Sequence, residues 1–177
     1  MTGPGPRVVL VGSMGAGKTT VGGLVAAALG VGFADTDHLV EAEAGKPVAE
    51  IFVDDGEAHF RALERAAVRR ALETHDGVLA LGGGAVLDEG TRALLAGHQV
   101  VFLKVGLSDA ASRVGLGVSR PLLLGNVRGR IKQLLDERTP IYTAVARHTV
   151  ATDGLSAAEV ADRVLVLVQD GEHAHDR

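Results

Sequence analysis

The sequence predicts an α/β fold in which a parallel sheet is covered by helices on both faces. Residues 8–11, 78–81 and 100–105 are short and almost continuously apolar, which is typical of strands buried on both sides. Segments of helical length separate these strands, and that order favours parallel pairing. A chain of 177 residues is long enough for one domain with one core.

In the first half of the chain, turn residues mark the ends of the elements. Residues 18–29 have helical length and are stopped by Gly30. A weak strand over 32–34 is followed by two short helices, 36–44 and 47–53. The clearest helix is 57–75, because its apolar side chains fall on one face. These side chains are Phe60, Leu63, Ala67, Ala71 and Leu72.

In the second half, residues 88–96 predict a helix and 108–113 a short helix capped by Ser108. Glycine and proline within 114–127 predict a long loop. A helix over 131–138 is expected to break before Pro140 and to resume over 141–146. The last expected elements are a strand over 148–152, a helix over 157–168 and a disordered tail over about 170–177.

Composition excludes several functions. There is no cysteine, and hence no thiol nucleophile or thiolate metal site. A net charge of −4 argues against a general nucleic-acid binder. No apolar run approaches the roughly 18 residues of a membrane span, and no signal peptide is visible. We therefore expect a soluble, cytoplasmic, single-domain protein (residues 1–177) without nucleic-acid or membrane partners.

The strongest motif follows the first strand. Residues 12–19, GSMGAGKT, match the P-loop pattern G-x-x-x-x-G-K-[ST] between a strand and a helix, as that motif requires. The glycines let backbone N–H groups surround phosphate oxygens at a helix N-terminus. Lys18 would bridge the β- and γ-phosphates of ATP, and the Thr19 hydroxyl would bind Mg²⁺. The alternative is a glycine-rich turn without a ligand.

Mg²⁺ at a P-loop usually has an acidic partner, but the strand over 78–81 ends without one. Asp35 and Asp37 are the best candidates. On an extended segment their side chains would leave on the same side, so that Asp35 binds the metal through water and Asp37 faces the substrate. The alternative is that one of them caps the following helix.

Other residues allow both a structural and a functional interpretation. The glycines at 82–84 place bare backbone where parallel sheets bind ligands, or they form a flexible turn. Arg61 lies three residues before Glu64, a spacing typical of a solvated ion pair. Arg120 lies in the long loop, where it could close over phosphates. Arg138 lies near a helix end, where cations are favourable.

Six short segments in order resemble the shikimate kinase family, from residue 8 to about 168. They are GSMGAGKTT at 12–20, ADTD at 34–37, IFVDDGEAHFRALE at 51–64, LGGGAV at 81–86, SRPLL at 119–123 and ERTPIY at 137–142. The resemblance implies a nucleoside-monophosphate-kinase-like P-loop sandwich with a five-stranded parallel sheet and a lid over about 115–126. It also implies transfer of the ATP γ-phosphoryl group to the 3-hydroxyl of shikimate in aromatic amino-acid biosynthesis, by a monomer using Mg²⁺.

The same resemblance implies roles for individual residues. Lys18, Asp37 and Arg120 are catalytic, with Asp37 as the base and Arg120 on the lid. Thr19 and Asp35 serve the metal. The residues implied to bind ATP are Gly12, Ser13, Met14, Gly15, Ala16, Gly17, Lys18, Thr19, Thr20, Arg113 and Arg120, with Arg113 stacked on adenine. Those implied to bind shikimate are Asp37, Arg61, Gly82, Gly83, Gly84 and Arg138. Arg61 and Arg138 would hold its carboxylate, because each guanidinium presents a two-pronged donor.

Two other functions stay open. A gluconate-type kinase shares the P-loop and the size, but it would not need Arg61 and Arg138 together with the three glycines. A non-catalytic nucleotide-binding regulatory module would keep the P-loop, although Asp37 argues against it. A GTPase is not expected, because the sequence has no N-K-x-D motif.

Overall fold

Five parallel strands form one sheet in the order β2-β3-β1-β4-β5. The computed structural model describes residues 5–115 and 124–175. The strands are β1 (Val8–Val11), β2 (Phe33–Asp35), β3 (Val78–Ala80), β4 (Val100–Lys104) and β5 (His148–Ala151). The expected parallel sheet is confirmed, and each strand lies within one or two residues of its expected position.

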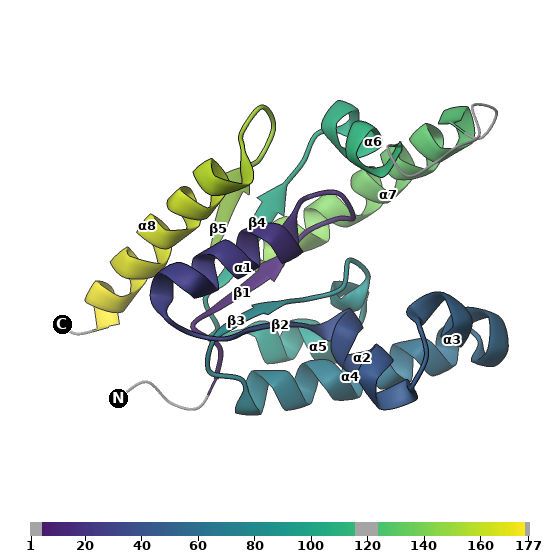
Figure 1. The fold of residues 1–177 in the computed structure, drawn as a ribbon, viewed down its shortest axis with the longest axis horizontal. Coiled ribbons are helices and arrows are strands. Elements are labelled where there is room, and N and C mark those ends of the chain that lie inside the picture. Colours follow the sequence, from purple (N-terminus) through teal and green to yellow (C-terminus); the bar gives the residue numbers. More distant parts are fainter. Residues whose placement is uncertain (1–4, 116–123, 176–177) are drawn as a thin grey trace.

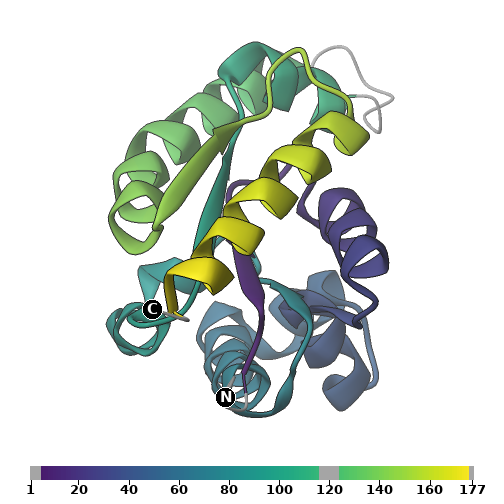
Figure 2. The same cartoon turned by 90° about the vertical axis from the view of Figure 1, so that its left-hand side faces the viewer.

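Helices connect the strands and cover both faces of the sheet (Figures 1 and 2). They are α1 (Lys18–Leu29), α2 (Thr36–Ala44), α3 (Val48–Asp55), α4 (Glu57–Thr74), the 3₁₀ turn η1 (Ala85–Leu87), α5 (Glu89–Leu95), α6 (Leu107–Gly115), α7 (Leu124–Val145) and α8 (Ala157–His175). In both views α1 and α8 lie side by side. Across the described ranges, no helix is both long and apolar enough to traverse a bilayer.

Alternate side chains of each strand pack into two apolar layers. In β1, Val8 and Leu10 pack with α1 and α8, whereas Val9 and Val11 pack with α4, α5 and α7. All four side chains are at most 1% exposed. A strand that is buried on both faces needs apolar residues at every position, which is why its sequence shows no alternation.

The carboxyl ends of the strands gather the residues of interest at one edge of the sheet. β1 leads into the P-loop, β2 into α2, and β3 into the glycines at 82–84. On one side of this edge lie α2, α3 and α4, and on the other lie α6 and α7 (Figure 1). A separate apolar cluster formed by Val40, Ile51, Phe60 and Ala67 joins α2, α3 and α4.

The predicted loop over 114–127 is partly wrong, and the lid over about 115–126 stays a prediction. Residues 114–115 belong to α6 and residues 124–127 to α7, while 116–123 lie outside the described residues. Ala110 of α6 is fully buried in the core, and this packing holds a helix that begins at Leu107. Ser108 therefore lies inside α6 and is not its cap.

α7 continues through Pro140, where a break was expected. Proline in a helix interior costs about 3 kcal/mol, because it removes one hydrogen bond and crowds the preceding turn. Beyond it, Tyr142 is 1% exposed, and Ile141 and Val145 pack on the same core. Each buried apolar side chain contributes roughly 1.5–3 kcal/mol, enough to offset the proline.

α8 continues to His175, so the expected disordered tail is wrong over residues 170–175. The guanidinium of Arg7 forms an ion pair with Glu172, and its Nε donates to the same oxygen at 3.1 Å. Gln99 donates to the carbonyl of Leu167 at 3.2 Å. These partners lie 68 to 165 residues away in sequence, and local polarity does not reveal them.

Candidate active site

A cavity of about 690 Å³ opens at the carboxyl edge of the sheet. It brings together most of the residues that the sequence singled out: Ser13, Met14, Gly15, Gly17, Lys18, Thr19, Thr20, Asp35, Asp37, Arg61, Gly82, Gly83, Gly84 and Arg138. Gly12 and Ala16 shape the P-loop without lining the cavity. Arg113 lies outside the lining, and Arg120 falls outside the described residues.

The P-loop backbone depends on glycine. Gly15 and Gly17 have φ values of 84° and 85°, in the left-handed region that glycine favours. A Cβ on Gly12 would lie 2.6 Å from the carbonyl oxygen of Leu103. A residue that carries a side chain would therefore strain the loop at any of these positions.

The Lys18 side chain curls over the P-loop. Its Nζ donates to the carbonyls of Gly12 and Ser13, at 2.6 and 3.1 Å. Burial lowers the pKa of Lys18 to about 8, although Asp35 and Asp37 oppose the shift. A cation that burial disfavours gains most from a bound anion, and polyphosphate supplies one.

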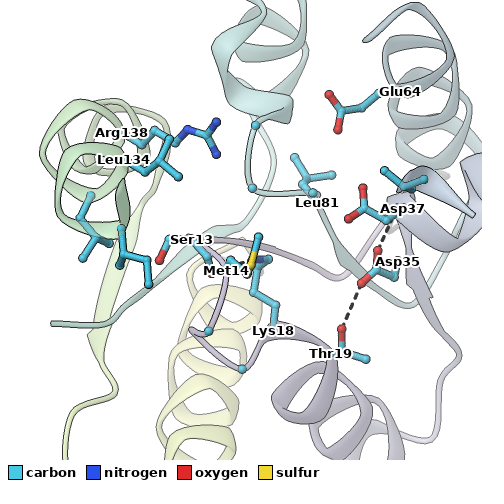
Figure 3. A pocket seen from close by; sticks show the side chains of 18 of the residues that line it. Ser13, Met14, Lys18, Thr19, Asp35, Asp37, Glu64, Leu81, Leu134 and Arg138 are labelled. Atoms are coloured by element: carbon cyan, nitrogen blue, oxygen red, sulfur yellow. Dashed lines mark hydrogen bonds between the residues drawn. The ribbon is translucent and has the colours of Figure 1, made fainter. Parts of the chain in front are cut away.

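Asp35 has the capping role considered for it and also contacts Thr19. Its Oδ1 accepts from the N–H of Asp37 at 2.9 Å and so caps α2, while its Oδ2 accepts from the Thr19 hydroxyl at 3.1 Å (Figure 3). Asp37 lies in the first turn of α2, so the predicted extended spacing of the two carboxylates is wrong. Both still line the cavity. Burial raises the pKa of Asp37, and the neighbouring Asp35 adds to this shift.

The three glycines after β3 make room for charged side chains. A Cβ on Gly82 would lie 2.6 Å from Asp37 Oδ1 and 3.0 Å from Glu64 Oε2. A Cβ on Gly84 would lie 2.5 Å from Arg61 Nη1. Among the two interpretations of this segment, close packing against site residues fits better than a flexible turn.

Arg61, which is partly buried, pairs with the buried Glu64, so the expected fully solvated ion pair is wrong. Arg61 Nη1 lies 2.8 Å from Glu64 Oε1, and Glu64 is only 3% exposed. Burial raises the pKa of Glu64, while Arg61 opposes that shift. Sequence reasoning missed Glu64 as a site residue. The sequence did contain a signal for its burial. Glu64 lies four residues after Phe60 and three before Ala67, so helical spacing puts it on their apolar face.

Helix α7 supplies the opposite wall, from which Arg138 points into the cavity (Figure 3). A Cβ on Gly83 would lie 3.5 Å from Arg138 Nη1, so the guanidiniums of Arg61 and Arg138 approach neighbouring glycines. Several lining residues were missed by the sequence interpretation. They are Val48, Phe52, Phe60, Leu81, Arg130, Ile131, Leu134 and Leu135. Helical spacing from Arg138 back to Leu134 and Arg130 could have identified part of this set.

Arg113 of α6 lies over the P-loop, where its Nη1 donates to the carbonyl of Gly15 at 2.7 Å. The side chain is exposed and reaches the loop from outside the cavity. This position brings a second cation to the phosphate-binding loop.

Positively charged side chains line the cavity in two groups. Lys18 and the P-loop lie at one end, and Arg61 and Arg138 meet near Gly83 and Gly84 at the other. Asp37, whose pKa burial raises, lines the cavity next to Gly82. Chemically, this arrangement can hold a nucleoside triphosphate beside an anionic alcohol and accept the proton of that alcohol.

Comparison with known proteins gives a consistent result. The family model "Shikimate kinase" matches residues 14–169. A shikimate kinase of Salinispora arenicola is 60% identical over 163 residues, covering 92% of this chain and 98% of the relative. The solved structure of shikimate kinase from Acinetobacter baumannii in complex with shikimate has a TM-score of 0.86 at 35% identity, covering 95% of this chain and 94% of that chain. A gluconokinase of Sinorhizobium meliloti shares the fold alone, with a TM-score of 0.58 and 21% identity, covering 96% of this chain and 94% of that one.

Proposed function

The chain belongs to the shikimate kinase family and is an ATP-dependent phosphotransferase with an alcohol acceptor, and we propose that its cavity aligns the 3-hydroxyl of shikimate with the γ-phosphate of ATP. This reaction is a step of aromatic amino-acid biosynthesis by the shikimate pathway. The observation that carries the proposal is the convergence of Arg61 and Arg138 on neighbouring glycines, beside a P-loop and Asp37.

At the nucleotide end, the P-loop N–H groups and Lys18 would hold the β- and γ-phosphates. Within the described residues no group of three acidic or histidine side chains forms a metal site. Mg²⁺ fits this arrangement, because it usually keeps several waters and binds one or two protein oxygens plus phosphates. Thr19 would supply one such oxygen, and Asp35, which accepts from the Thr19 hydroxyl, would hold one of the waters. When bound, the ion would neutralise charge on the phosphates.

At the acceptor end, the Arg61 and Arg138 guanidiniums would bind the shikimate carboxylate, and the backbone at Gly82, Gly83 and Gly84 would border its ring. The 3-hydroxyl oxygen then bonds to the γ-phosphorus as the bond to the β–γ bridging oxygen breaks, and ADP leaves. Asp37 would take the hydroxyl proton. Its raised pKa supports this role, since a base works best with a pKa closer to the working pH.

We also propose that Arg113 serves the adenine side and that Arg120 closes over the phosphates. The cation of Arg113 already rests on the P-loop carbonyl of Gly15, which supports a position near the nucleotide. We further propose that the protein is a monomer with one catalytic domain, as its resemblance to the family implies. Light scattering of the purified protein would test the monomer.

The deciding experiment measures ADP release with shikimate, gluconate and a panel of sugars as acceptors. We expect turnover with shikimate alone, and phosphorus NMR should assign the product phosphate to the 3-position. Preference for gluconate would favour the other kinase class. ATP binding without ADP release on any acceptor would favour a regulatory module.

A further inference from the structure

The chain has one tyrosine, Tyr142, which lies one helical turn beyond Arg138 on α7. Residues four apart share a helix face, so both side chains are directed toward the glycines after β3. The ring of Tyr142 is 1% exposed and packs on Phe102, with ring centroids 5.0 Å apart. The core therefore holds the ring in place, and its hydroxyl reaches the edge of the cavity.

The Tyr142 hydroxyl donates to the carbonyl of Gly83 at 2.5 Å. The carbonyls of Gly82 and Gly84 accept instead from backbone N–H groups of the following turn, at 3.0 and 3.1 Å. Tyr142 is thus the side chain that fixes the peptide between Gly83 and Gly84. In a trans peptide the C=O and N–H point in opposite directions, so this bond also sets the direction of the Gly84 N–H.

The glycines themselves do little to restrain that peptide. Without Cβ atoms, adjacent glycines rotate at small steric cost. Within residues 5–115 and 124–175, the N–H groups of Gly83 and Gly84 have no protein acceptor. Both glycines line the cavity, so a ligand there can accept from them. The direction in which the Gly84 N–H points toward a ligand therefore depends on the Tyr142 hydroxyl.

The same hydroxyl lies beside Arg138. A Cβ on Gly83 would be 3.5 Å from Arg138 Nη1 and 3.6 Å from the Tyr142 hydroxyl, so both groups reach the same side of the glycine. Burial raises the pKa of Tyr142, although the Arg138 guanidinium opposes that shift. The phenol therefore keeps its proton for Gly83.

We propose that Tyr142 is a positioning residue for shikimate, because its hydroxyl fixes the Gly83–Gly84 peptide beside Arg138 in advance of binding. The proposal rests on the function given above, which puts the acceptor carboxylate between Arg138 and these glycines. Its effect should appear in acceptor binding and not in ATP binding, because Tyr142 touches neither the P-loop side chains nor Thr19.

Tyr142→Phe tests this directly, since it removes the hydroxyl and keeps the ring on Phe102. We expect the shikimate dissociation constant to rise about five- to tenfold, as for one lost hydrogen bond, while that of ATP stays within about twofold. When Arg138 is already replaced by Ala, Tyr142→Phe should raise the shikimate dissociation constant by less than about half as much, because the effects of substitutions at neighbouring residues are not additive. Thr91→Val is the matched control. It removes another buried hydroxyl, bonded to Asp88 at 3.2 Å outside the cavity, and should change neither constant.

A second readout needs no variant. The chain has no tryptophan and one tyrosine, so Tyr142 dominates the intrinsic fluorescence. Saturating shikimate should change this emission. Wild-type shikimate affinity in Tyr142→Phe, or an emission that does not respond to bound shikimate, would overturn the positioning role and leave the kinase activity in place. If the wild-type protein neither binds nor phosphorylates shikimate, the proposed function itself is wrong.

Discussion

Lys18 illustrates how a single residue can serve binding at the expense of stability. Burial lowers its pKa to about 8, which means that folding disfavours its charge. We expect Lys18→Met to reduce kcat by about 10³-fold or more, because the phosphates lose their central cation. The melting temperature should be equal to or above that of the wild type.

Lys132→Met is the matched control for this variant. Lys132 lies on the exposed side of α7, where it pairs with Asp136, outside the cavity lining. Steady-state kinetics and thermal melts of both variants should show the loss of kcat in Lys18→Met and not in Lys132→Met. Near wild-type turnover in Lys18→Met would refute the P-loop assignment.

Asp37 is the second residue whose charge is disfavoured by burial. As the base for the acceptor hydroxyl, it should be needed for turnover more than for nucleotide binding. We expect Asp37→Asn to lower kcat by about 10²-fold or more while the KM for ATP changes little. The folded protein should not lose stability, because the amide removes a charge that burial penalises. A change confined to the KM for ATP would move Asp37 to the metal site.

At the scale of an element, the turn after β3 tests whether glycine is needed for space. Gly82→Ala places a Cβ 2.6 Å from Asp37 Oδ1, and overpacking of this kind costs about 1–3 kcal/mol. The nearest atoms to a Cβ on Gly83 are 3.5 Å away, an ordinary contact. We therefore expect Gly82→Ala to lower the free energy of unfolding by that amount and Gly83→Ala to change it by less than about 0.5 kcal/mol. Denaturant unfolding measures both, and equal losses would contradict the packing argument.

The helices and strands also show which features could be predicted from the sequence. β1 and α1 were predicted with their bounds, because a continuous apolar run and Gly30 are local signals. The P-loop was found for the same reason, since its residues are contiguous. Glu64 was placed at the surface because its spacing from Arg61 also fits a surface ion pair, and the apolar face that it shares with Phe60 and Ala67 was not weighed against that pairing. Continuation of α7 through Pro140 depends on core contacts of Tyr142 that no local pattern encodes.

At the scale of the whole molecule, the acceptor end of the cavity exists only in the folded chain. Arg61 comes from α4 and Arg138 from α7, on opposite sides of the carboxyl edge of the sheet. The sheet order puts β3 between β2 and β1, so the glycines after β3 lie where both helices can reach them. Two guanidiniums brought together in this way suit a planar carboxylate, which can accept two-pronged hydrogen bonds from each.

This geometry predicts that the carboxylate of shikimate, and not only its ring, determines recognition. Removal of Arg138 should weaken shikimate binding by about 1.5–3 kcal/mol, or roughly ten- to a hundredfold, with little change for ATP. Arg61→Ala should do the same and also cost stability, since it leaves the buried Glu64 without its partner. Arg65→Ala, an exposed position on the same helix, is the control and should bind shikimate normally.

The test is calorimetric titration of shikimate and its methyl ester into each protein. The ester should bind the wild type poorly, and Arg138→Ala should lose much of the discrimination between acid and ester. If the wild type binds both alike, the arginines do not hold the carboxylate, and the orientation proposed for shikimate in this cavity is wrong.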